Sequence, residues 1–147
     1  MKAILLDIHG SADSFKCREI SKPKILPKHV ILKVSASGVN PVDCKIRSGL
    51  LAGIGPDLPG ILHGDVAGVV TEVGEDVIDF KVGDEVFGCI GGFKSMPGVL
   101  AEYALADARL LALKPASLSM AEAAVLPLVA ITAGNALMER GKISKGE

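Results

Sequence analysis

Short runs of hydrophobic residues, separated by glycines and prolines, occupy the chain up to Pro115. In residues 29–39, hydrophobic side chains recur at every second position: Val30, Leu32, Val34 and Ala36. A period of two places unlike side chains on the two faces of a β-strand. The runs expected to form strands are 2–7, 29–39, 67–73, 85–89, 100–106 and 110–113. Gly74 and the pair Gly83-Asp84 fall between runs and predict turns.

The pattern changes after Pro115, where helix signals replace strand signals. Ser119 and Glu122 have the S-x-x-E spacing of a capping box, which predicts a helix start at Ser119. Pro127 should end or kink this helix, because proline lacks an amide proton and clashes with the preceding turn. A second helix is expected over residues 128–140, before Gly141. We therefore divide the chain into a β-rich part, residues 1–118, and a helical part, residues 119–147.

Composition limits the classes of protein to which the chain can belong. Its 147 residues suit one domain, and 49% hydrophobic residues with a net charge of −1 argue against disorder and nucleic-acid binding. No hydrophobic run reaches the roughly 20 residues of a membrane span, and the N-terminus resembles a strand more than a signal peptide. We therefore expect a cytoplasmic protein that is not bound to a membrane. Cys17, Cys44 and Cys89 are odd in number and far apart, which favours free thiols.

One long motif is specific enough to suggest a family. Residues 64–77 read Gly-Asp-Val-Ala-Gly-Val-Val-Thr-Glu-Val-Gly-Glu-Asp-Val, and residues 80–86 read Phe-Lys-Val-Gly-Asp-Glu-Val. Further segments match the pattern of the same family in order and spacing; they are 37–43, 45–49, 101–103, 127–128 and 132–133. Over nearly its whole length, the chain resembles the medium-chain dehydrogenase/reductase superfamily.

The resemblance implies a mainly β fold. Residues 1–118 would form a GroES-like, strongly twisted β-barrel that serves as the catalytic, substrate-binding domain. Residues 119–147 would be the helices that connect it to a Rossmann domain, which binds NADPH and is missing from this chain. Composition and periodicity alone indicate only a compact β-rich domain with a helical tail.

The residues that bind zinc in other members of the superfamily are absent. Zinc-dependent alcohol dehydrogenases carry a catalytic cysteine where this chain has Asn40. Their Gly-His-Glu motif corresponds to His63-Gly64-Asp65, which places Gly64 at the position of the histidine ligand. Cys89 is the one cysteine in residues 88–100, whereas a structural zinc needs about four closely spaced ligands. We therefore expect no metal.

This pattern is similar to the zinc-free quinone oxidoreductase and enoyl-reductase-like branch, whose members move a hydride from NADPH to a quinone or an enone. The protein must orient the acceptor, stabilise charge on its carbonyl oxygen and exclude water. Asn40 is the candidate uncharged donor to that oxygen or to the nicotinamide ribose; alternatively it is a turn-forming asparagine before Pro41. Asp43 would hold Asn40 or Lys45 in place, or would only cap a helix.

Lys45 and Thr132 complete the predicted site. Lys45 would position a cofactor phosphate or an anionic substrate, or is only solvated. Thr132 matches the family threonine that reaches the nicotinamide from the helix joining the two domains; alternatively it is a buried threonine bonded to its own helix. We expect the four side chains to converge on one edge of the barrel. Tyrosines of typical quinone reductases are replaced here by Lys45 and Leu51, which leaves the acceptor open between quinone and enone.

The glycine-rich phosphate loop of the family is not found in the sequence. The clusters Gly53-Ile54-Gly55 and Gly91-Gly92 lack the G-x-G-x-x-G spacing that opens a βαβ unit. We expect the chain to belong to a longer NADPH-dependent enzyme, to be inactive alone, and to form a homodimer, if any, through the missing domain. Two alternatives stay open, namely a relative of the zinc-type alcohol dehydrogenases and a binding module without catalytic activity.

The absence of the usual zinc ligands generates a first prediction. Elemental analysis of protein purified without chelators should find no stoichiometric zinc, because the cysteine expected at position 40, the histidine expected at position 64 and the cysteine lobe are absent. The alternative is an improvised site of His63, Asp65 and Cys44. Stoichiometric zinc held at Asn40, Gly64 or Cys89 would show that the correspondence with the zinc enzymes is wrong.

Overall fold

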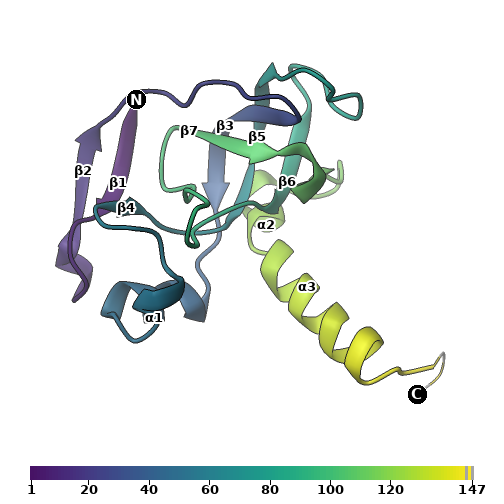
Figure 1. Cartoon of the computed structure of the whole chain (residues 1–147). Helices are drawn as coiled ribbons and strands as arrows, with labels where there is room; N and C mark the ends of the chain where they lie inside the picture. Colours follow the sequence, from purple (N-terminus) through teal and green to yellow (C-terminus); the bar gives the residue numbers. More distant parts are fainter. Residues whose placement is uncertain (145, 147) are drawn as a thin grey trace.

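The strands form two antiparallel sheets, which lie beside each other in Figure 1. The computed structural model describes residues 1–144 and residue 146. The three-stranded sheet has the order β2-β1-β4, with β1 at Lys2–Leu6, β2 at Phe15–Glu19 and β4 at Gly60–Ile61. The five-stranded sheet has the order β7-β3-β5-β6-β8. Its strands are β3 (His29–Ser37), β5 (Asp65–Val73), β6 (Glu85–Cys89), β7 (Tyr103–Asp107) and β8 (Leu111–Leu113).

Residues 99–102 connect the two sheets. The amide of Ile4 in β1 donates to the carbonyl of Leu100 at 2.8 Å, and the amide of Glu102 donates to the carbonyl of Lys2 at 3.0 Å. The carbonyl of Glu102 in turn accepts from the amide of Val34 in β3 at 3.0 Å. The result is the twisted, mainly β fold expected from the sequence. Because residues 100–102 bond to β1, β7 begins three residues later than the predicted run 100–106.

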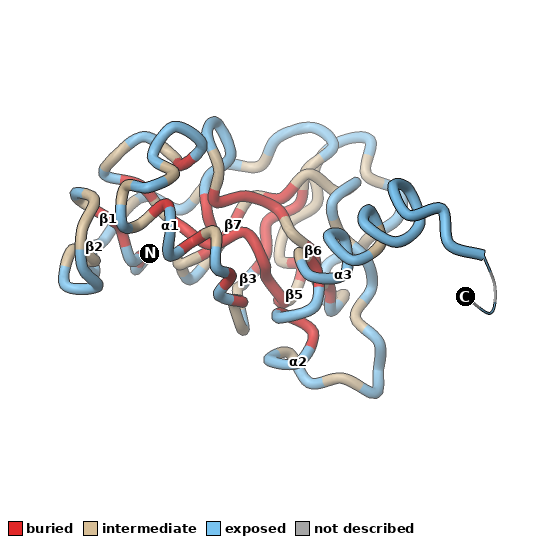
Figure 2. Tube along the Cα trace, turned by 90° about the horizontal axis from the view of Figure 1, so that it is seen from below, coloured by how far each residue is buried: buried red, intermediate tan, exposed pale blue. Residues whose placement is uncertain are grey.

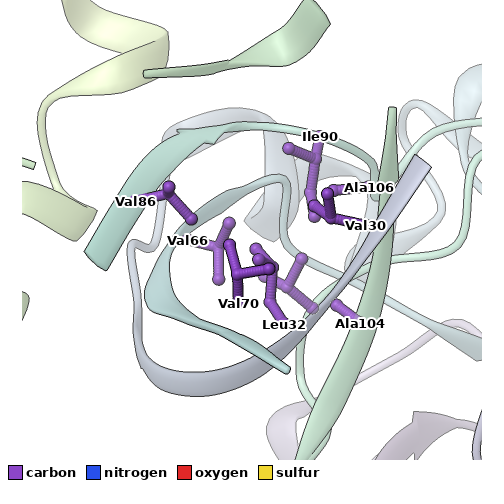
Figure 3. Packing of buried hydrophobic residues seen from close by; sticks show 9 residues of the cluster. Val30, Leu32, Val66, Val70, Val86, Ile90, Ala104 and Ala106 are labelled. Atoms are coloured by element: carbon purple, nitrogen blue, oxygen red, sulfur yellow. The ribbon is translucent and has the colours of Figure 1, made fainter. Parts of the chain in front are cut away.

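The main core lies between the strands of the five-stranded sheet, where aliphatic side chains point toward one another (Figure 3). The members that are fully or almost fully buried are Val30, Leu32, Val66, Val70, Val86, Ile90, Val99, Ala104 and Ala106. Burying an aliphatic side chain of this size stabilises the fold by about 1.5–3 kcal/mol. The alternation predicted for residues 29–39 is confirmed on this face for Val30, Leu32 and Val34, but Ile31 is fully buried on the opposite face as well. Ala36 packs against a smaller cluster of alanines, after an irregularity in the pairing of β3 with β5.

Three elements of the barrel were not predicted: β2, β4 and the helix α1 at Pro41–Ser48. β2 is exposed at nearly every position, so its sequence shows no alternation. β4 has only two residues. α1 has eight residues, buries only Asp43 and Ile46, and ends at Gly49 with φ 91°, a left-handed conformation that glycine adopts without strain. Short 3-10 helices lie at Ala12–Ser14, Ala52–Ile54 and Ala108–Leu110.

Two helices follow the barrel, as predicted. α2 spans Met120–Ala124 and begins with the expected capping box, in which the Ser119 amide donates to the Glu122 carboxylate at 2.8 Å. α3 spans Pro127–Gly134 and continues as a π-helix over Asn135–Arg140, so Pro127 separates the two helices. α3 extends away from the sheets (Figure 1) and is exposed over most of its length (Figure 2). Within the described residues, no helix is long and apolar enough to cross a membrane.

The core of the five-stranded sheet generates a second prediction. Leu32→Ala should lower the free energy of unfolding by about 2–5 kcal/mol, because Leu32 is fully buried and its removal leaves a cavity. Urea denaturation measures this loss. Ile78→Ala is the control, since the Ile78 side chain is 90% exposed and its removal should change stability by less than about 0.5 kcal/mol. Equal losses in the two variants would contradict the assigned core.

Candidate active site

Four polar or charged side chains are buried among the described residues, and they come from two neighbouring segments: Asn40, Asp43, His63 and Asp65. The pairing of β3 with β5 places Ser37 opposite Val66. The residues that follow β3 therefore lie beside the residues that precede β5. This register is what brings the start of α1 next to the pair His63 and Asp65.

Asn40 occupies the N-cap position of α1 and is held through both its backbone and its side chain. Its backbone amide donates to the Asp43 carboxylate at 2.7 Å. Asp43 therefore caps the helix, which is one of the two roles expected for it. Its side-chain amide donates through Nδ2 to Oδ2 of Asp65 at 2.9 Å. The Asn40 side chain is only 7% exposed. These contacts fix both the position and the orientation of the Asn40 amide.

Asp65 is fully buried and connects the barrel to α3. The backbone amide of Leu128, the second residue of α3, lies 3.1 Å from Oδ1 and 3.2 Å from Oδ2 of Asp65. A carboxylate at a helix N-terminus interacts favourably with the free amides and the positive end of the helix dipole. From the sequence, Asp65 was considered only as part of an improvised metal site with His63 and Cys44, and not as a partner of Asn40. One feature of the sequence could have indicated this role, namely a charged residue at the start of a largely hydrophobic strand. A buried aspartate almost always has a hydrogen-bonding partner, so such a residue is a candidate for a paired site.

His63 and Asp43 are buried titratable groups, and each influences the pKa of the other. Burial lowers the pKa of His63, although the carboxylates of Asp43 and Asp65 partly oppose this effect. Burial raises the pKa of Asp43, although the Asn40 amide and the charge of His63 partly oppose it. Nδ1 of His63 lies 2.8 Å from Oγ of Ser37. The place of His63 beside Asn40 and Asp43 was likewise not predicted from the sequence. His63 and Asp43 line a cleft of about 210 Å³ beside α1.

The other two predicted site residues are placed differently. Lys45 is exposed on α1, two residues after Asp43, and residues at this spacing lie on different sides of a helix. Thr132 donates its hydroxyl to the carbonyl of Leu128 at 2.8 Å, one turn earlier in α3. It is exposed rather than buried, because α3 extends away from the barrel. The structure thus brings Asn40 and Asp43 together, attaches the helix of Thr132 to them through Asp65, and leaves Lys45 on the surface.

The backbone at Gly64 leaves no space for a side chain. A Cβ atom there would lie 2.5 Å from the carbonyl oxygen of Gly91 and 3.0 Å from Sγ of Cys89. The histidine ligand of the zinc enzymes therefore does not fit this position unless the backbone shifts. Within residues 1–144 and 146, no three histidine, cysteine or acidic side chains are grouped closely enough to hold a metal ion.

Comparison with known proteins matches residues 26–116 to the family described as the alcohol dehydrogenase GroES-like domain. The chain is 40% identical to the NADPH-dependent alkenal/one oxidoreductase, chloroplastic, of Arabidopsis thaliana, covering 100% of this chain and 39% of that protein. An alcohol dehydrogenase superfamily protein from Novosphingobium aromaticivorans has 42% identity and a TM-score of 0.94, with 100% and 44% coverage. The quinone oxidoreductase from Coxiella burnetii has 34% identity and a TM-score of 0.86, with 100% and 47% coverage. The chain spans about two fifths of the length of the curated relatives that it matches.

The surroundings of Asp65 generate a third prediction, on thiol reactivity. Cys89 lies opposite Asp65 in the pairing of β5 with β6. Burial, the charge of Asp65 and a hydrogen bond to its carboxylate raise the pKa of the Cys89 thiol to about 12. Only the thiolate reacts with iodoacetamide, so at pH 8 the exposed Cys17 and Cys44 should be alkylated well before Cys89.

Mass spectrometry of the folded protein measures which cysteines carry the label. Labelling in denaturant is the control and should modify all three cysteines. Labelling of Cys89 at the same rate as Cys44 in the folded protein would contradict the described environment of Cys89.

Proposed function

Because the chain belongs to the family of alcohol dehydrogenase GroES-like domains, we propose that it is the substrate-binding part of an NADPH-dependent reductase that transfers hydride to enones or quinones. The names of two relatives support this substrate class, since one is an alkenal/one oxidoreductase and the other a quinone oxidoreductase. The observation that carries the proposal is the buried, oriented amide of Asn40 at the start of α1.

The chemistry assigned to Asn40 follows from its hydrogen bonds. The side-chain amide has two N–H groups, of which one donates to Asp65. The other can donate to the carbonyl oxygen of an enone or quinone, where negative charge grows as hydride arrives, or to the nicotinamide ribose. A donor that is oriented beforehand loses no energy in reorganising during the reaction. When bound, NADPH supplies the hydride itself.

The remaining predicted residues have supporting roles in the proposal. Asp43 holds the backbone of Asn40 through the cap of α1. The Thr132 hydroxyl donates its hydrogen to Leu128, so its oxygen remains available to accept a hydrogen bond from the nicotinamide. Lys45, on the exposed side of α1, would attract a cofactor phosphate or an anionic substrate. The division into a substrate domain, residues 1–118, and connecting helices, residues 119–147, is part of the same proposal.

The exposed surface of α3 supports its proposed contact with a nucleotide-binding domain. Large apolar side chains are exposed along α3 and its π-helical continuation: Val129, Ile131, Leu137 and Met138. Several large apolar side chains exposed on one element favour an interaction surface. We assign the surface to the NADPH-binding domain that the resemblance implies, through which a homodimer would also form. The cytoplasmic location remains a prediction, since the Arabidopsis relative is named as chloroplastic.

The role of Asn40 generates a fourth prediction, which needs a complete enzyme. In a chimera, residues 1–147 replace the matching segment of the Arabidopsis alkenal/one oxidoreductase, and NADPH oxidation is followed with a simple enone and with a benzoquinone. Asn40→Ala should lower kcat by about 100-fold or more, the usual cost of removing one donor to a developing oxyanion. Lys16→Ala, an exposed substitution on β2, is the control and should leave kcat unchanged.

Each alternative result has a distinct meaning. A folded chimera that reduces neither acceptor would favour the binding module without catalytic activity. An active chimera in which Asn40→Ala keeps full kcat would show that Asn40 is not the donor. Circular dichroism and thermal unfolding of each variant establish that the compared proteins are folded.

A further inference from the structure

The carboxylate of Asp65 receives hydrogen bonds from two separate segments of the chain. Its donors are the side chain of Asn40 and the backbone amide of Leu128. We infer that Asp65 is a positioning residue, which selects the orientation of the Asn40 amide and fixes the start of α3 at the same time. This inference rests on the proposed function, because it concerns the residues assigned to the acceptor and the nicotinamide.

The orientation of Asn40 depends on the chemistry of its partner. An asparagine side chain presents an acceptor oxygen on one side and an NH₂ donor on the other, and rotation by half a turn exchanges them. An ionised carboxylate can only accept hydrogen bonds. Asp65 therefore stabilises the rotamer in which Nδ2 faces it, as observed at 2.9 Å. With an amide in place of the carboxylate, both rotamers of Asn40 would find a partner.

The start of α3 depends on the same side chain. Leu126, the N-cap residue of α3, offers no side-chain hydrogen bond to the free amides of the first turn. Asp65 supplies this acceptor from β5 instead. Thr132 lies one turn further along α3 and bonds to the carbonyl of Leu128. One carboxylate thus determines the positions of both residues that the proposal assigns to the nicotinamide.

The packing around Asp65 leaves little freedom for other arrangements. A Cβ atom at Gly38 would lie 2.4 Å from the carbonyl oxygen of Ala124 and 3.0 Å from Cβ of Asp65. Gly38, which follows the end of β3, is therefore in close contact with the end of α2 and with Asp65. Asp65 is fully buried, so its hydrogen bonds cannot be replaced by bonds to solvent. A substitution at Asp65 should therefore change the positions of the groups that donate to it.

Asp65→Asn in the active chimera tests this inference, since the substitution keeps the shape and removes the charge. We expect kcat to fall at least tenfold at a temperature where the variant is folded. In the background of Asn40→Ala, the same substitution should change kcat by less than twofold, because an amide at this position keeps an acceptor oxygen for Leu128 and the loss therefore passes through Asn40. Asp107→Asn is the matched control, since it removes the charge of a partly buried aspartate that caps a short helix and pairs with Arg109, and should leave kcat unchanged.

The outcomes separate this inference from the proposed function. If Asn40→Ala reduces kcat while folded Asp65→Asn does not, Asp65 has only a structural role and the inference is wrong. If the reductions in kcat caused by the two substitutions multiply in the double variant, Asp65 acts independently of Asn40 and the inference is also wrong. If Asn40→Ala itself has no effect, the proposed function of the site fails first.

A second measurement needs no substitution and covers the case in which Asp65→Asn does not fold. In NMR spectra of the unmutated chain, one of the two Nδ2 protons of Asn40 should exchange with solvent slowly, together with the amide of Leu128, because Asp65 accepts from both. Rapid exchange of both Nδ2 protons and of the Leu128 amide would overturn the inference.

Discussion

The pairing of a fully buried carboxylate is the constraint on which the candidate site depends. Transferring an ionised carboxylate from water to a protein interior costs several kcal/mol unless hydrogen bonds replace those to water. Asp65, at the start of β5, obtains these bonds from the start of α1 and the start of α3. The requirements of one side chain therefore fix the relative positions of three elements that are far apart in the sequence.

Close backbone contact around the same residues strengthens this constraint. At Gly38 and Gly64, a Cβ atom would lie within 2.5 Å of a backbone carbonyl oxygen, so only glycine fits without a shift. In the correspondence that the resemblance implies, Gly64 would stand where zinc-dependent alcohol dehydrogenases have a histidine ligand, and Asn40 where they have a cysteine. The buried cluster around them contains an oriented amide, two carboxylates and an imidazole whose pKa is lowered by burial. Such a cluster suits the stabilisation of charge by hydrogen bonds.

Much of the fold and part of the site could be predicted from the sequence. Alternation of side chains identified β3, turn residues separated the strands, and the capping box at Ser119 together with Pro127 located both final helices. These signals are local, because each depends on residues within a turn or strand of one another. The resemblance carried by residues 64–77 indicated the GroES-like barrel, and the matching segments 37–43 and 132–133 pointed to Asn40 and Thr132.

Other features were decided only by the tertiary structure. β2 and α1 leave weak periodic signals because one is exposed and the other is short. The role of Asp65 depends on a contact with Leu128, which is 63 residues away and donates a backbone amide that carries no sequence signature. Lys45 and Asp43 are close in sequence, but the helical turn directs one to solvent and the other to the interior. The sequence by itself determined most of the strands, the two final helices and the candidate residues. Packing decided which of these residues meet, because burial and long-range hydrogen bonds arise only when distant segments come together.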